Sequence, residues 1–137
     1  MTIKHAVTGT QIYYWVATGF AGVALTAIGV ADIARGPAVA QALIRLGYPA
    51  YLATILGVGK LLGVLAIVTP GHPRLKELAY AGFFFVLTGA AASHALSGDP
   101  VTNVLVPVVL LSFVLASWTL QPARNAYGVV ASVHRVA

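Results

Sequence analysis

Lys60 is the residue most clearly suited to a chemical role, because it lies near the middle of the otherwise uncharged stretch 50–68. A cation at the centre of a membrane helix costs about 2.5 to 3.5 kcal/mol on insertion scales, so it should face a bundle interior or water. There it has a partner of opposite charge or loses its proton. A lysine that reaches the interface, or that forms one helix–helix ion pair, fits the same pattern. Lys60 is therefore a candidate for ligand binding or proton transfer.

Glu77 is a candidate partner for Lys60, because it lies in the first turns of the next apolar stretch, 75–96. A carboxylate at that position also favours the N-terminus of a helix, which is the simpler explanation. The long Lys60 side chain can nevertheless extend toward the same end of the bundle. The sequence thus leaves open a buried pair of Lys60 and Glu77 that would serve as a proton or ligand site.

His94 lies about one turn from the far end of the stretch 75–96 and follows the small residues 89–92. An imidazole there can bind a quinone carbonyl, relay a proton or ligate haem. A hydrogen bond to a neighbouring helix explains it equally well. No other histidine lies within an apolar stretch. A two-histidine haem site within one chain therefore has no support, and quinone is favoured over haem.

Two aspartates lie at the same end of the predicted bundle as His94. Asp32 ends the first apolar stretch and is a natural partner for His94 or Arg35. Asp99 precedes a proline and is better explained as a helix cap than as part of a site, with Asn103 as the alternative cap. The candidate ligand-binding residues are therefore Lys60, His94, Glu77 and Asp32.

Four apolar stretches, at about 11–30, 50–68, 75–96 and 103–121, must position these side chains. Each approaches the roughly 20 residues that cross a hydrocarbon core. The chain is 59% hydrophobic and 8% charged, which leaves too little polar surface for a water-soluble sphere. The apolar runs do not alternate every second residue, which disfavours a β-barrel. We predict an all-α membrane bundle of four helices in contact with the lipid bilayer, with one domain at 1–121 and a basic tail at 122–137.

A short segment between the first two stretches has its own helical pattern. It opens at Gly36-Pro37, and Val39, Leu43 and Leu46 share one helical face. This pattern predicts a short interfacial helix that ends at Gly47. A polar loop is the alternative.

The charged residues indicate membrane topology rather than a nucleic-acid surface. Eight Lys and Arg stand against three Asp and Glu, but the cations lie singly beside apolar stretches. Binding to nucleic acid is therefore not expected. The positive-inside rule places both termini and the loop 72–76 in the cytoplasm. This assignment rests on Lys4, Arg74, Lys76, Arg124 and Arg135 on one side, against Arg35 and Arg45 on the other.

Several classes of chemistry have no support. The chain lacks cysteine, which excludes thiolate catalysis and thiolate metal sites, and no metal site is expected. The motifs of nucleotide-binding loops, zinc proteases and serine hydrolases are also missing.

Four short motifs resemble the DoxX-like family of small bacterial membrane proteins: Lys60-Leu61-Leu62-Gly63, the segment 73–85, Thr88-Gly89-Ala90 and Ser93-His94. The resemblance covers the second and third stretches and the four-helix layout. It implies a location in the bacterial inner membrane and a redox or quinone function, since the family name comes from a subunit associated with a quinone-reducing thiosulfate oxidoreductase. The family often carries an acid after the phenylalanine run, where this chain has Val86. Its loss removes the most obvious partner of Lys60.

Three functions follow as hypotheses, and the sequence does not indicate whether the protein is an enzyme. The first is a redox-associated membrane subunit that binds a quinone or similar lipophilic molecule and receives electrons from a soluble redox partner. The second is a small transporter that works as a homo-oligomer, and the third is a scaffold. Under the first, we expect the ligand in the half of the bundle away from the cytoplasm, between Asp32, Lys60 and His94. The competing expectation is that small residues such as Gly59 and Gly89 let the helix backbones close that space.

Overall fold

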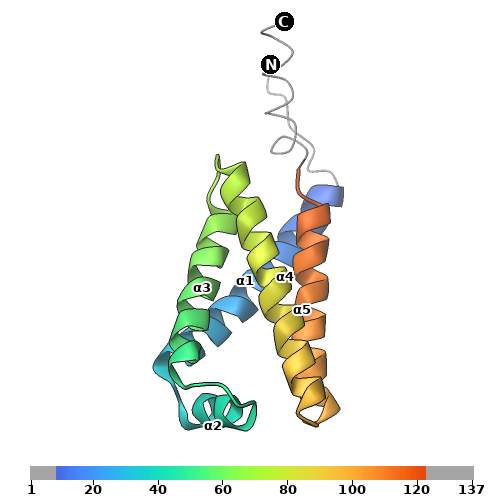
Figure 1. The fold of residues 1–137 in the computed structure, drawn as a ribbon. Coiled ribbons are helices and arrows are strands. Elements are labelled where there is room, and N and C mark those ends of the chain that lie inside the picture. Colours follow the sequence, from blue (N-terminus) through green and yellow to red (C-terminus); the bar gives the residue numbers. More distant parts are fainter. Residues whose placement is uncertain (1–8, 123–137) are drawn as a thin grey trace, which may run out of the picture.

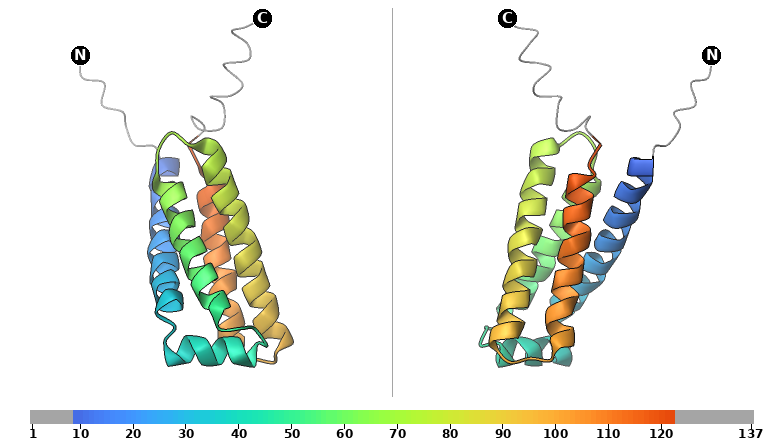
Figure 2. Two further views of the ribbon diagram at one scale, coloured as in Figure 1. Left: turned by 60° about the vertical axis from the view of Figure 1, so that its left-hand side comes forward. Right: turned by 90° about the vertical axis from the view of Figure 1, so that its right-hand side faces the viewer.

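The computed structural model describes residues 9–122, and this part of the chain contains five helices and no strand. Four long helices, α1 (Gly9–Ala34), α3 (Tyr51–Val68), α4 (Pro73–Leu96) and α5 (Val101–Thr119), form a bundle (Figure 1). The short α2 (Pro37–Arg45) crosses one end of it, and the described chain begins and ends at the opposite end (Figure 2). We call these the α2 end and the terminal end. Lys4, Arg124, Arg135 and the predicted tail from residue 123 onward lie outside the described residues.

The four long helices are long and apolar enough to cross a membrane, which confirms the predicted fold class. Their outer surfaces carry many large exposed apolar side chains, including Val23, Phe85 and Leu78, at 74%, 72% and 69% exposure. A soluble protein rarely exposes apolar patches of this extent. The exterior of the bundle is therefore a surface that contacts lipid.

The helix ends differ from the predicted ones at two places near the α2 end. α1 continues to Ala34 and stops there because Arg35, with a φ of 48°, has left the right-handed helical conformation. α5 begins at Val101 with Pro100 as its N-cap, and no side chain caps it. The prediction of an Asp99 or Asn103 cap is therefore wrong.

The terminal half of the bundle is joined by a chain of buried hydroxyl groups on α1, α4 and α5. Thr18 Oγ1 donates to the Tyr14 carbonyl at 2.7 Å and lies 2.6 Å from Ser117 Oγ, which lies 2.7 Å from Tyr80 Oη. Each hydroxyl has one proton to donate. Ser117 must therefore donate to Thr18, and Tyr80 to Ser117. Within residues 9–122, every buried side-chain nitrogen and oxygen has a hydrogen-bond partner, so this half of the bundle is held by specific polar contacts as well as by apolar packing.

Candidate ligand-binding cavity

A cavity of about 620 Å³ occupies the half of the bundle that α2 covers. Side chains of all five helices line it, and most of them are apolar. The polar or charged ones are few: Asp32, Arg45, Tyr48, Lys60, Ser93, His94 and Asn103. A mostly apolar pocket with a few polar groups is the usual form of a small-molecule site. The cavity is therefore the candidate functional site.

The cavity ends near the middle of the bundle at an ion pair between α1 and α3. Lys60 Nζ lies 2.5 Å from Asp32 Oδ2, and the two side chains are only 11% and 13% exposed. This contact supplies the opposite charge that the position of Lys60 requires. It is a charge-assisted hydrogen bond, which is stronger than one between neutral groups.

A close approach of two glycines makes this pair geometrically feasible. A Cβ added to Gly57 would lie 2.6 Å from the Gly29 carbonyl oxygen, and one added to Gly29 would lie 3.1 Å from the Gly57 carbonyl oxygen. Asp32 and Lys60 each follow one of these glycines by three residues. α1 and α3 are antiparallel (Figure 1), and Cβ atoms lean toward the N-terminus of their own helix. The two side chains therefore lean toward each other along the bundle.

A second charged group lies at the α2 end, where His94 Nδ1 is 2.6 Å from Asp99 Oδ2. Arg45 Nη1 approaches the other oxygen of Asp99 at 3.7 Å. The hydrogen bond from His94 and the charge of Arg45 lower the pKa of the Asp99 carboxyl. An ionised carboxylate only accepts hydrogen bonds, so His94 must donate through Nδ1, and Nε2 is the nitrogen that can address a ligand.

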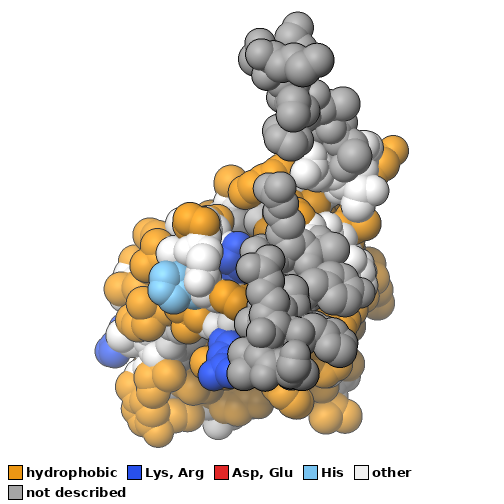
Figure 3. Space-filling model, turned by 90° about the horizontal axis from the view of Figure 1, so that it is seen from above, with side chains coloured by type: hydrophobic (Ala, Val, Ile, Leu, Met, Phe, Trp, Pro, Cys, Tyr) orange, Lys and Arg blue, Asp and Glu red, His pale blue; other side chains and the backbone are white. Residues whose placement is uncertain are grey.

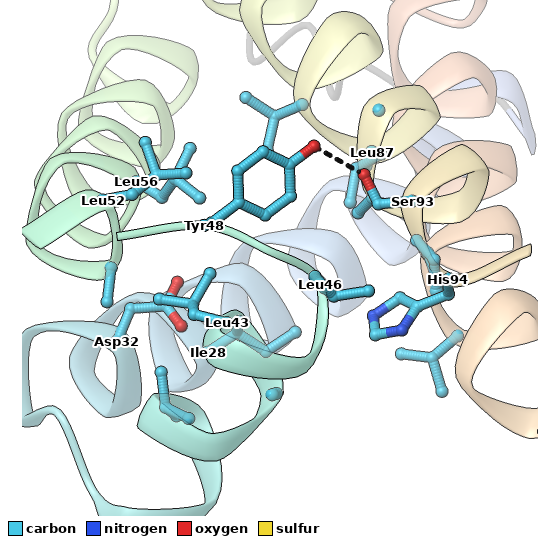
Figure 4. Close-up of a pocket in the computed structure, with 18 of the residues that line it drawn as sticks. Ile28, Asp32, Leu43, Leu46, Tyr48, Leu52, Leu56, Leu87, Ser93 and His94 are labelled. Atoms are coloured by element: carbon cyan, nitrogen blue, oxygen red, sulfur yellow. Dashed lines mark hydrogen bonds between the residues drawn. The ribbon is translucent and has the colours of Figure 1, made fainter. Parts of the chain in front are cut away.

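The loop after α2 closes one side of the cavity. Tyr48 Oη forms a 2.9 Å hydrogen bond with Ser93 Oγ of α4, drawn as a dashed line in Figure 4. In the same view, Asp32 and His94 lie on opposite sides of the Tyr48 ring. The loop turns at Gly47, whose φ of +80° suits glycine. The loop from α2 to α3 thus passes across one side of the cavity, and the hydrogen bond from Tyr48 to Ser93 attaches it to α4.

The structure brings three of the four candidate residues together. Asp32, Lys60 and His94 line one cavity, whereas Glu77 lies near the terminal end. Glu77 accepts hydrogen bonds from Trp118 Nε1 at 2.8 Å and from Gln121 Nε2 at 3.2 Å. The pair of Lys60 and Glu77 that the sequence left open does not form. The suggested pairing of Asp32 with His94 or Arg35 is also wrong, since Asp32 pairs with Lys60 and Arg35 donates to Thr54.

Several residues in the cavity, or in contact with its lining as Asp99 is, carried no functional signal in the sequence. Asp99 and Arg45 meet only through tertiary structure, and Tyr48 resembles any aromatic residue at a membrane boundary. One local signal was available at Pro107, which lies inside α5 and lines the cavity with Asn103. A proline has no amide hydrogen, so it cannot donate to the Asn103 carbonyl four residues earlier. Among the described residues, no three His, Cys, Asp or Glu side chains gather into a metal site.

The space expected between small residues is open on the α3 and α4 surfaces. A Cβ added to Gly59 or Gly89 would meet no atom within 4 Å, and Gly89 lines the cavity. The close helix approach expected beside Gly59 occurs instead at Gly57, one turn before Lys60. The competing expectation, in which Gly59 and Gly89 close the space, is therefore wrong.

The sequence matches a known protein family. The model of the DoxX-like family matches residues 16–117, a range that contains every residue of the cavity. No curated protein and no solved structure shows significant similarity to the chain.

Proposed function

This chain belongs to the DoxX-like family, and from that premise we propose that it is a redox-associated membrane subunit that binds a quinone or a similar lipophilic molecule inside its bundle. The main support for the proposal is an apolar cavity that has the ion pair of Asp32 and Lys60 near the middle of the bundle and His94 near the α2 end. A flat ring with oxygens on opposite sides complements such a distribution. Lys60 Nζ can donate a hydrogen bond to one oxygen of the ring, and His94 Nε2 can form a hydrogen bond with the other.

Proton supply supports the same ligand class. Reduction of a quinone to a hydroquinone consumes two electrons and two protons. A soluble redox partner would bring the electrons to the membrane surface. Lys60 as an ammonium can release a proton to one ring oxygen. His94 as an imidazolium, with a proton on each ring nitrogen, can release the Nε2 proton to the other ring oxygen. Asp32 and Asp99 hold the two side chains in place. The apolar walls would exclude water from the ring.

A titration tests this proposal. The full-length protein in lipid nanodiscs should bind a tail-free substituted benzoquinone saturably. Joint replacement of Asp32→Asn and Lys60→Met should weaken binding about tenfold or more, because a hydrogen bond to a charged group contributes about 1.5 to 3 kcal/mol. Glu77→Gln should leave the affinity unchanged, since Glu77 lies outside the cavity. The proposal fails if the unmodified protein shows no saturable binding, or if the double variant binds equally well.

A transporter is the second candidate, and the ion pair of Asp32 and Lys60 favours it, since intramembrane charges also mark substrate pathways. Such a transporter would work as a homo-oligomer. Proton-coupled uptake of a small molecule into liposomes would favour a transporter over a quinone-binding subunit, provided that the double variant Asp32→Asn and Lys60→Met loses the uptake.

The orientation we propose is that of a protein of the bacterial inner membrane with both termini in the cytoplasm. Lys and Arg side chains are visible at the terminal end (Figure 3). Arg74 and Lys76 lie there, and the further cations Lys4, Arg124 and Arg135 adjoin the same end in the sequence. The positive-inside rule assigns this end to the cytoplasm. The cavity then lies in the half of the bundle away from the cytoplasm.

Topology reporters check the orientation. A reporter fused after Ala137 should be active in the cytoplasm, because the cation bias favours that side. One inserted in the loop 98–102 should be active on the opposite side. The reverse pattern would place the cavity in the cytoplasmic half and overturn the assignment.

A further inference from the structure

We propose that a groove between α3 and α4 holds the first part of a hydrocarbon tail on the ligand whose head group lies in the cavity. The inference rests on the proposed function and adds the substrate class: a head group with an attached hydrocarbon chain, rather than a compact lipophilic molecule. The main support is that the groove and the cavity adjoin each other. Leu56, Lys60 and Val86 line both of them.

The groove has the chemistry of a tail site. It measures about 380 Å³, and every residue that lines it, apart from Lys60, is apolar or glycine. A polar ligand would find one hydrogen-bonding side chain there, at the border with the cavity. A hydrocarbon chain attached to a head group near Lys60 therefore matches the order of the two spaces, with polar groups first and apolar walls after them.

Missing side chains keep the groove open. A Cβ added to Gly59 or to Gly82 would meet no atom within 4 Å. The ring of Phe83 closes the back of the groove, where it packs so closely on Gly63 that an added Cβ would lie 2.6 Å from its Cζ atom. Phe83 is buried, whereas the flanking Leu62 and Leu78 are 61% and 69% exposed. The groove thus has a packed floor and a side that is open to lipid.

The length of the groove limits how much tail it can hold. Beyond Lys60 it continues along α3 to Ala66, six residues or about 9 Å at about 1.5 Å per residue. An isoprenoid unit adds four carbon–carbon bonds of about 1.5 Å, shortened by the bond angles, so roughly two units fit. The rest of a longer tail would lie among the lipids.

The free energy of moving the tail from lipid into the groove is small, so binding affinity is a poor test of the groove and the position of the tail is a better one. A tail that moves from lipid into the groove gains little from the hydrophobic effect, because lipid chains are equally apolar. Dispersion contacts with the groove remain, and they are individually small. Affinity should therefore depend only weakly on tail length. The position of the tail is the sharper readout.

Photo-crosslinking maps that position. The probe is a benzoquinone with a two-unit isoprenoid tail that carries a diazirine on its second unit, added to the full chain in nanodiscs. We expect labels on Leu62 and Leu78, lost when an excess of the tail-free quinone occupies the cavity. Gly59→Leu and Gly82→Leu each fill the groove and should abolish these labels while tail-free binding persists. Gly19→Leu is the matched control, since Gly19 is an exposed helical glycine on α1 that also has no atom within 4 Å of an added Cβ.

Each other outcome overturns a distinct claim. Labels elsewhere, together with normal binding of the tail-free quinone, reject the groove and leave the proposed function standing. Labels on Leu62 and Leu78 that an excess of the tail-free quinone does not reduce mean that the tail reaches these residues from the surrounding lipid, which rejects the groove as a tail site. If a photoreactive amino acid placed at position 62 or 78 crosslinks to a second copy of the chain, the groove is a contact between protomers and the tail site is rejected. Failure of the tail-free quinone to bind at all rejects the proposed function itself.

Discussion

Replacing Asp32 with asparagine should destabilise the bundle by about 3 kcal/mol, because the nearly buried ammonium of Lys60 then loses its counter-charge. Lys60→Met should also destabilise, since it leaves the Asp32 carboxylate without a partner. The two changes made together should restore most of the loss, because they remove both charges from the low-dielectric interior. Equilibrium unfolding in mixed micelles, followed by circular dichroism, measures the four free energies of the double-mutant cycle.

The cycle separates this pair from a general effect of substitution. A coupling energy above about 1.5 kcal/mol is expected, since the residues are in direct contact. If the two single changes add without coupling, the short distance between Nζ and Oδ2 carries no net interaction, and the pair does not hold α1 against α3.

The second large effect is expected at Gly57, where alanine should cost about 2 to 3 kcal/mol. The new Cβ would lie 2.6 Å from the Gly29 carbonyl oxygen and 2.7 Å from Ile33 Cγ1, so α1 and α3 would have to separate. Overpacking of this kind typically costs about 1 to 3 kcal/mol. The Asp32 side chain would shift too, because its Cβ would lie 3.0 Å from the new atom. Unfolding in micelles measures the loss, and titration with the tail-free quinone measures the damage to the cavity.

Gly59→Ala is the matched control, two residues further along the same helix. An added Cβ there meets no atom within 4 Å, and alanine favours a helix over glycine by about 0.5 to 1 kcal/mol. This variant should therefore be neutral or more stable. Equal stability of the two alanine variants would show that the helices do not approach closely at Gly57, and the account of how Asp32 meets Lys60 would then be wrong.

Local pattern determined the membrane-spanning helices of this protein. An uninterrupted apolar run about 20 residues long has few alternatives to a membrane helix, since backbone groups in lipid must bond within their own segment. The helix after Gly36-Pro37 followed from the spacing of Val39, Leu43 and Leu46 on one face, and the structure confirms a helix at Pro37–Arg45. The need of Lys60 for a counter-charge also followed from the sequence, because the depth of a charge within a span depends on its position alone.

Only the tertiary structure decided which residues meet. The partner of Lys60 is Asp32, 28 residues earlier, rather than Glu77, which is nearer in sequence and belongs to the adjoining helix. The choice depends on the rotation of α1 about its axis and on the close approach at Gly29 and Gly57, and hydropathy reports neither. Asp99 shows the same limit. Beside Pro100 it has the local signature of a cap, yet its oxygens face His94 and Arg45, because α2 folds back across the end of the bundle and brings a cation to it. Charges separated along the chain become partners when helix packing brings them together, and that packing depends on contacts among all the helices at once.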